Sequence, residues 1–167
     1  MKKWKINENF NIEIAYKLIG EIHSLIKYLE HSGECLEREY LIDIYKSLKR
    51  RAGGDIEAYS VIINLIDNDK MSLTVRSFLG VLITQVPNRK RIPQEEREYI
   101  KGRLENLLKK EEIPIIKLGI AVSYANWGYS SESIEEIRKL IEYYKNSTET
   151  TDLAREYLMD IESKLKN

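Results

Sequence analysis

Arg38-Glu-Tyr-Leu-Ile-Asp-Ile44 is the stretch that decides the fold, because it returns near the end of the chain as Arg155-Glu-Tyr-Leu-Met-Asp-Ile161. Six of the seven positions are identical. The same frame fits two further segments, which begin at Arg76 and Lys117, so the four starts lie 38, 41 and 38 residues apart. A cation that recurs at a period of about forty residues, followed each time by an apolar residue three places on, predicts an array of helical repeats. The four apolar residues are Leu41, Leu79, Ile120 and Leu158.

Apolar residues spaced by threes and fours fall into eight segments, as on one face of amphipathic helices. Pro93 and Pro114 stand where a helix can begin, and Gly128 where one can end. No stretch alternates with a period of two residues, so no sheet is expected. We predict an all-α fold in which the eight helices form four antiparallel pairs, stacked as a short right-handed α-solenoid in one domain, 1–167. The segments span residues 12–30, 36–48, 56–66, 72–85, 93–108, 114–128, 134–144 and 153–165.

The composition of the chain excludes several classes of protein. There are 27 basic and 27 acidic residues, and this balance gives no whole-protein reason to expect nucleic acid or an anionic membrane as the partner. No apolar run approaches the roughly 20 residues that span a bilayer, so no membrane association is expected. The single Cys35 cannot form an internal disulfide, which favours a reducing compartment. We therefore expect a cytoplasmic protein.

The second repeat carries a recognisable pattern. Leu65-Ile-Asp67, a short turn with Asp69, and then Val75-Arg76 before a helix of small and apolar residues resemble a HEAT repeat. The first and fourth repeats keep the Arg without the Val, the third has Lys117, and the usual Asp-Pro of the turn is missing throughout. The resemblance implies a binding scaffold that presents the second helix of each pair on a concave face. A small array of this kind is similar to the immunity proteins that bacteria pair with toxins.

The chain shows no catalytic or metal-binding motif. His23 and His31 are the only histidines and have no Cys partner at the spacing that tetrahedral zinc requires. Cys35 has no plausible His base, and there is no Gly-x-Ser-x-Gly motif. Gly53-Gly54 lacks the spacing and the Lys-Ser/Thr of a phosphate loop. We expect no enzymatic activity, no cofactor and no metal.

The recurring cation can be interpreted as a binding ladder or as a structural feature. In HEAT-like arrays this position pairs with carboxylates of the turns, and such carboxylates are within reach in the sequence. We therefore favour the structural interpretation. The cations are Arg38, Arg76, Lys117 and Arg155, and the carboxylates are Glu34, Asp67, Asp69, Glu112 and Asp152.

The connections between the helix pairs are better candidates for a binding surface. Equivalent loops of a solenoid lie along one edge, so the three connections should form a stripe that is first basic and then aromatic. Such a stripe suits a phosphate backbone or an acidic protein. In the alternative interpretation, basic residues at helix ends offset the helix dipole and stay solvated. The residues of the stripe are Lys49, Arg50, Arg51, Arg89, Lys90, Arg91, Trp127 and Tyr129.

Two tyrosines extend the predicted binding surface. Tyr45 and Tyr124 share a column on the second helices, where a concave face would lie. Tyrosine is enriched at protein interfaces. We therefore include both side chains among the residues expected to bind a partner.

These observations lead to two functional hypotheses. The first is a non-enzymatic protein-binding module, specifically an immunity protein that binds a bacterial toxin and covers its active site. The second is a nucleic-acid-binding protein that uses the basic and aromatic edge. A salt-dependent affinity for any DNA duplex would distinguish the second from the first.

Overall fold

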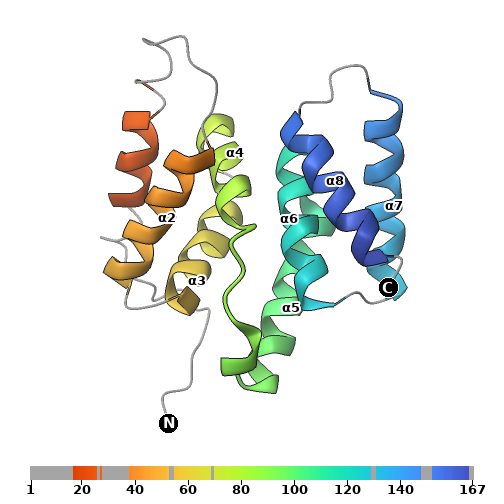
Figure 1. Ribbon diagram of the computed structural model, residues 1–167, viewed down its shortest axis with the longest axis horizontal. Helices are drawn as coiled ribbons and strands as arrows, with labels where there is room; N and C mark the ends of the chain where they lie inside the picture. Colours follow the sequence, from red (N-terminus) through yellow and green to blue (C-terminus); the bar gives the residue numbers. More distant parts are fainter. Residues whose placement is uncertain are drawn as a thin grey trace. The chain divides into compact units, whose positions relative to one another are not determined.

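A computed structural model describes residues 17–25, 27, 38–52, 55–68, 70–128, 131–147 and 152–165. In these residues it contains eight α-helices and no β-strand, which confirms the predicted all-α class. The predicted helix at 12–30 is described only over part of its length. The first helix covers residues 17–25, and it is followed by α2 (Arg38–Ala52), α3 (Asp55–Ile66), α4 (Leu73–Leu82), η1 (Arg89–Arg91), α5 (Gln94–Lys110), α6 (Pro114–Trp127), α7 (Ser131–Lys145) and α8 (Asp152–Leu165) (Figure 1).

The contacts between Cα atoms divide the chain into two compact units, Met1–Pro87 and Asn88–Asn167. The first unit holds the helix at 17–25 with α2, α3 and α4, and the second holds η1 and α5 to α8. The predicted solenoid and the predicted single domain both depend on how the two units are arranged relative to each other. Both therefore stay predictions.

Helix α3 forms the centre of the first unit. It packs against α2 and α4, and an unbroken run of its residues from 58 to 63 is buried. A helix that is apolar on nearly every side needs neighbours around it. Ser72 is the N-cap of α4, and its hydroxyl accepts from the backbone N–H of Val75 at 3.3 Å. Arg76 Nη2 then donates to the Ile66 carbonyl at 3.2 Å, so this recurring cation binds the C-terminal end of α3.

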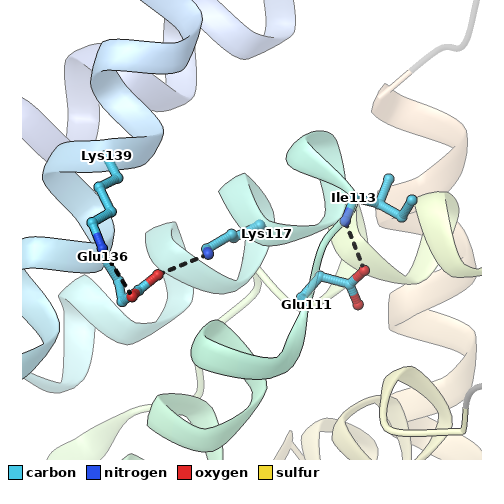
Figure 2. A network of polar contacts seen from close by, with 5 residues as sticks. All are labelled: Glu111, Ile113, Lys117, Glu136 and Lys139. Carbon is cyan, nitrogen blue, oxygen red and sulfur yellow. Dashed lines mark hydrogen bonds and ion pairs between the residues drawn. The ribbon is translucent and has the colours of Figure 1, made fainter.

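Helix α6 has the same central role in the second unit. It packs against α5, α7 and α8 (Figure 1), and its buried residues include the run from Leu118 to Ala125. The turn before it is held by Glu111, a buried carboxylate whose Oε1 accepts from the backbone N–H of Ile113 at 3.1 Å (Figure 2). Pro114 then opens the helix and Gly128 closes it, as predicted.

Gly128 has a backbone conformation that only glycine adopts easily. Its φ is 94° and its ψ is 144°, and a Cβ placed there would meet nothing within 4 Å. We expect Gly128→Ala to lower the free energy of unfolding by about 1–3 kcal/mol through backbone strain alone. Urea unfolding followed by circular dichroism measures this loss.

Gly102 is the matched control, because it lies inside α5 and also has open space around its Cβ position. Gly102→Ala should raise the free energy of unfolding by up to about 1 kcal/mol, since Ala is the better helix former. Equal effects of the two substitutions would contradict the strain at Gly128.

The recurring cation of the third repeat joins two helices. Lys117 Nζ of α6 donates to Glu136 Oε2 of α7 at 3.0 Å, and Lys139 Nζ lies 3.8 Å from Glu136 Oε1 (Figure 2). The sequence predicted that this cation pairs with a carboxylate of a turn. That prediction was wrong for Lys117, because the carboxylate that it reaches belongs to the following helix rather than to a turn.

The fourth cation behaves as predicted, whereas the first is not described. Arg155 Nη1 lies 3.2 Å from Asp152 Oδ1, and both side chains are exposed. An exposed pair contributes little to stability. The side chains of Arg38, Glu34 and Asp69 lie outside the described residues. The three cations that can be followed therefore make structural contacts.

The carboxyl group of Glu136 should make the free energy of unfolding depend on pH. The hydrogen bond from Lys117 holds the pKa of the Glu136 carboxyl below its usual value, against the opposing effect of burial, and the charges of Lys117, Lys139 and Lys109 lower it further. The ion pair therefore stabilises the fold fully above the usual glutamate pKa, and this contribution disappears as the pH falls through the lowered value. When the pH is lowered from neutral into the acid range, the free energy of unfolding should fall by about 1 kcal/mol less in Glu136→Gln than in the wild type.

Unfolding free energies of the two proteins at several pH values provide the measurement. Glu142→Gln, an exposed substitution in the same helix, is the control and should leave the pH profile unchanged. An unchanged profile for Glu136→Gln would contradict a folded-state role of the pair.

Candidate anion-binding pocket

The face of α5 near its N-terminal end carries four polar side chains. Gln94, Arg97, Glu98 and Lys101 are separated by three, one and three residues, so they lie on one side of the helix. The opposite side carries apolar residues at helical spacing, and these are buried: Ile100, Leu104, Leu107 and Leu108. Burial of the apolar stripe therefore fixes the direction in which the polar side chains point.

The short helix η1 brings two more cations to the same place. Asn88 Oδ1 accepts from the backbone N–H of Lys90 at 3.1 Å, and the N–H of Ile92 binds the Arg89 carbonyl at 3.1 Å. Ile92 is buried at the end of this turn, whereas no residue of η1 itself is buried. The turn thus anchors the chain through Ile92 and leaves Arg89 and Lys90 exposed.

These two elements and the end of α6 form a pocket of about 480 Å³ in the second unit. Four of its side chains are cations and one is a carboxylate, so the local charge is strongly positive although the whole chain is neutral. The wall also contains the indole of Trp127, which is only 8% exposed. The lining residues are Arg89, Lys90, Gln94, Arg97, Glu98, Lys101 and Trp127.

The cations of the pocket differ from five other basic side chains of this unit. Within the described ranges, Lys117, Lys139, Lys145, Arg155 and Lys164 each have a carboxylate within ion-pair distance. No described carboxylate lies within that distance of the pocket cations, which are Arg89, Lys90, Arg97 and Lys101. In addition, Arg97 Nε is buried and has no hydrogen-bond partner among the described residues. The pocket therefore holds positive charge that the rest of this unit does not neutralise.

The structure brings together part of the predicted stripe. Arg89, Lys90 and Trp127, from two different connections, line the same pocket. Arg91 is exposed on η1 but does not line it. The side chain of Arg51 and the whole of Tyr129 lie outside the described residues.

The basic residues of the first connection belong to the other unit. Lys49 and Arg50 are exposed on α2, where they line a pocket of about 470 Å³ with Lys46 and Asp43. That these residues form one stripe with the cations of the second unit stays a prediction.

The two tyrosines predicted for an exposed concave face are buried. Tyr45 is 7% exposed and Tyr124 has no exposed surface. Their exposure was predicted wrongly, because a tyrosine column at helical spacing can point into the core as readily as toward solvent. Tyr124 also satisfies its hydroxyl internally, through a hydrogen bond of 2.8 Å to Ser133. We therefore exclude both side chains from the candidate site.

The sequence did not indicate that residues of α5 line the site. Arg97 and Lys101 have the spacing of a helix face, and they follow the basic Arg89-Lys90-Arg91 closely, which is the signal that could have identified them. A polar helix face is ordinarily just the solvated side of an amphipathic helix. Only the fold of η1 shows that the polar face of α5 lies beside further cations.

The side chains of the pocket have the charge that suits an anion. Its titratable groups are four cations and Glu98, and none of the lining residues is a nucleophilic Ser or Cys or a His. Among the described residues there is no group of three or more His, Cys, Asp or Glu side chains that could hold a metal ion. No helix in the described ranges is both long and apolar enough to cross a bilayer. Guanidinium and ammonium groups in a concave site favour an anionic ligand.

Comparison with known proteins found no match for the chain among protein-family models, curated proteins or solved structures.

Proposed function

We propose that this chain is a non-enzymatic binding module whose partner is an acidic protein. The observation that supports the proposal is the pocket of the second unit, where four cations have no described carboxylate partner. Electrostatic complementarity of this kind accelerates the encounter of two proteins and selects the partner. An acidic side chain of the partner would enter the pocket and pair with Arg97 and Lys101.

The partner that the sequence favours is a bacterial toxin. In this proposal the helices form a short HEAT-like array, and the basic pocket attaches the array over the toxin so that the toxin's active site is covered. The resemblance of the second repeat to HEAT repeats and the lack of a recognisable catalytic motif support this part of the proposal. The protein encoded beside this chain is then the first partner to test.

Binding of nucleic acid is supported less well by the same pocket. A protein that follows a phosphate backbone uses a row of cations along a groove and exposed aromatic rings on which bases stack. Here the cations surround a single pocket of about 480 Å³, and Trp127 is only 8% exposed. The zero net charge of the chain also gives no long-range attraction to nucleic acid.

Affinity purification from the native cells tests the proposal with three forms of the chain. The wild type is compared with Arg97→Glu/Lys101→Glu and with Lys109→Glu/Arg138→Glu, which reverses the same types of charge at exposed positions outside the pocket. We expect one dominant acidic protein with the wild type and with the control. The pocket variant should lose it.

The proposal is overturned if the pocket variant retains the partner, or if the wild type recovers no dominant protein. A parallel titration with duplex DNA at about 50 mM salt addresses the nucleic-acid alternative. Salt-dependent binding of the duplex that disappears only in the pocket variant would replace the protein partner by nucleic acid.

A further inference from the structure

We propose that the pocket of the second unit is specific for a phosphoryl group, carried by a phosphate monoester. The inference rests on the proposed function, since it names the chemical group that anchors the partner in the same pocket. The shared chemistry is a dianionic phosphate on a small organic group, whether that group is a side chain of a protein or a free metabolite.

The number of cations favours a dianion over a single carboxylate. One Arg can neutralise one carboxylate through two parallel hydrogen bonds, whereas the pocket supplies four cations against the single charge of Glu98. A phosphate monoester carries close to two negative charges at neutral pH and has three strong acceptor oxygens. It can therefore accept from a guanidinium and from ammonium groups at the same time.

Arg97 is the cation of the pocket with a donor that the described residues leave unpaired. Its Nε is buried and has no hydrogen-bond partner among the described residues, and the side chain lines the pocket. A buried donor that is left unpaired costs free energy, so the surrounding protein does not fully satisfy this guanidinium. The planar guanidinium presents donors in a fixed geometry that matches phosphate.

The remaining wall suits the organic part of such an ester. Trp127 contributes an apolar surface beside the cations, and the pocket volume of about 480 Å³ lies within the range of small-ligand sites. Glu98 opposes the binding of any anion. Its presence in the wall leads to a distinctive expectation, because removing its charge should strengthen the binding of phosphate.

Fluorescence of Trp127 measures binding directly. The chain has two tryptophans, so Trp4→Phe leaves Trp127 in the wall of the pocket as the only one. In this background, phenyl phosphate should change the emission in a saturable manner at millimolar concentration or below. Benzoate, which has the same ring and one carboxylate, should bind at least about tenfold more weakly, a difference of about 1.4 kcal/mol.

Single substitutions locate the ligand in the pocket. Arg97→Gln and Lys101→Gln should each weaken phenyl phosphate about 10- to 100-fold, as expected for the loss of a hydrogen bond between charged groups. Glu98→Gln should tighten it severalfold, and the exposed Arg138→Gln should leave it unchanged. Thermal unfolding of each variant verifies that it is folded.

Two further probes identify the source of the phosphate. A short uncharged peptide with one phosphoserine should bind more tightly than phenyl phosphate if the group belongs to a protein, and more weakly if the natural ligand is a free ester. Both results support a phosphoryl site. Equal binding of benzoate and phenyl phosphate, or an unchanged affinity in Arg97→Gln, overturns the inference.

Failure of the inference is distinguishable from failure of the proposed function. If Arg97→Glu/Lys101→Glu loses the protein partner while no phosphate probe binds, the pocket recognises carboxylates, and only the phosphoryl specificity is wrong. If phosphate binds with the expected dependence on Arg97 while the variant keeps its protein partner, the proposed docking role is wrong and a phosphate site remains.

Discussion

Replacing Ile120 with Ala is expected to lower the free energy of unfolding by about 2–5 kcal/mol. Ile120 is the recurring apolar residue of the third repeat, and its side chain has no exposed surface in α6, the central helix of the second unit. The substitution removes buried methyl groups and leaves a cavity that the packed neighbours cannot fill. Leu79→Ala should have a comparable effect in the first unit, because Leu79 is equally buried there.

The last repeat provides the control. Leu158 occupies the same position of the repeat but is only half-buried on α8. Leu158→Ala should therefore cost about 1 kcal/mol, since less apolar surface leaves the core. Urea unfolding of the three variants measures these losses. A loss at Leu158 as large as that at Ile120 would contradict the difference in burial.

The positions of the helices could be predicted because apolar periodicity is a local property. The helix α5 lies where the apolar spacing of residues 93–108 predicted one, and α6 begins at Pro114 and closes at Gly128 as expected. Partners in three dimensions were harder to predict. Lys117 was expected near a turn carboxylate, yet it pairs with Glu136, nineteen residues further along the chain. Which helix face meets which neighbour depends on packing, and periodicity carries no information about that.

The candidate site illustrates the same limit. Basic and aromatic connections are visible in the sequence, and parts of two of them do meet, since Arg89 and Lys90 of a basic connection share a pocket with Trp127 of the aromatic one. The contribution of Arg97 and Lys101 was not visible, because a charged face is common to nearly all surface helices. Tyr124 shows the opposite error: its residue type is typical of interfaces, but its place on a central helix buries it.

Tyr124 begins a chain of hydrogen bonds in the core of the second unit. Ser133 donates its only hydroxyl hydrogen to Glu105 Oε1 at 2.8 Å, so Tyr124 must be the donor in its own 2.8 Å hydrogen bond to Ser133 Oγ. The chain of bonds joins α6, α7 and α5. Tyr124→Ala removes both the ring and the hydroxyl, and should lower the free energy of unfolding by about 3–5 kcal/mol.

Two milder substitutions separate the ring from the hydroxyl. Tyr124→Phe keeps the ring but takes the donor from Ser133, and should cost about 1–3 kcal/mol because the site is buried. Tyr143→Phe removes an exposed hydroxyl from the same unit and should be almost neutral. Combining Tyr124→Phe with Ser133→Ala should cost less than the sum of the two single changes, since each removes the same hydrogen bond. Strict additivity, or a Tyr124→Phe protein as stable as Tyr143→Phe, would show that the core of this unit is held by the packing of the ring alone.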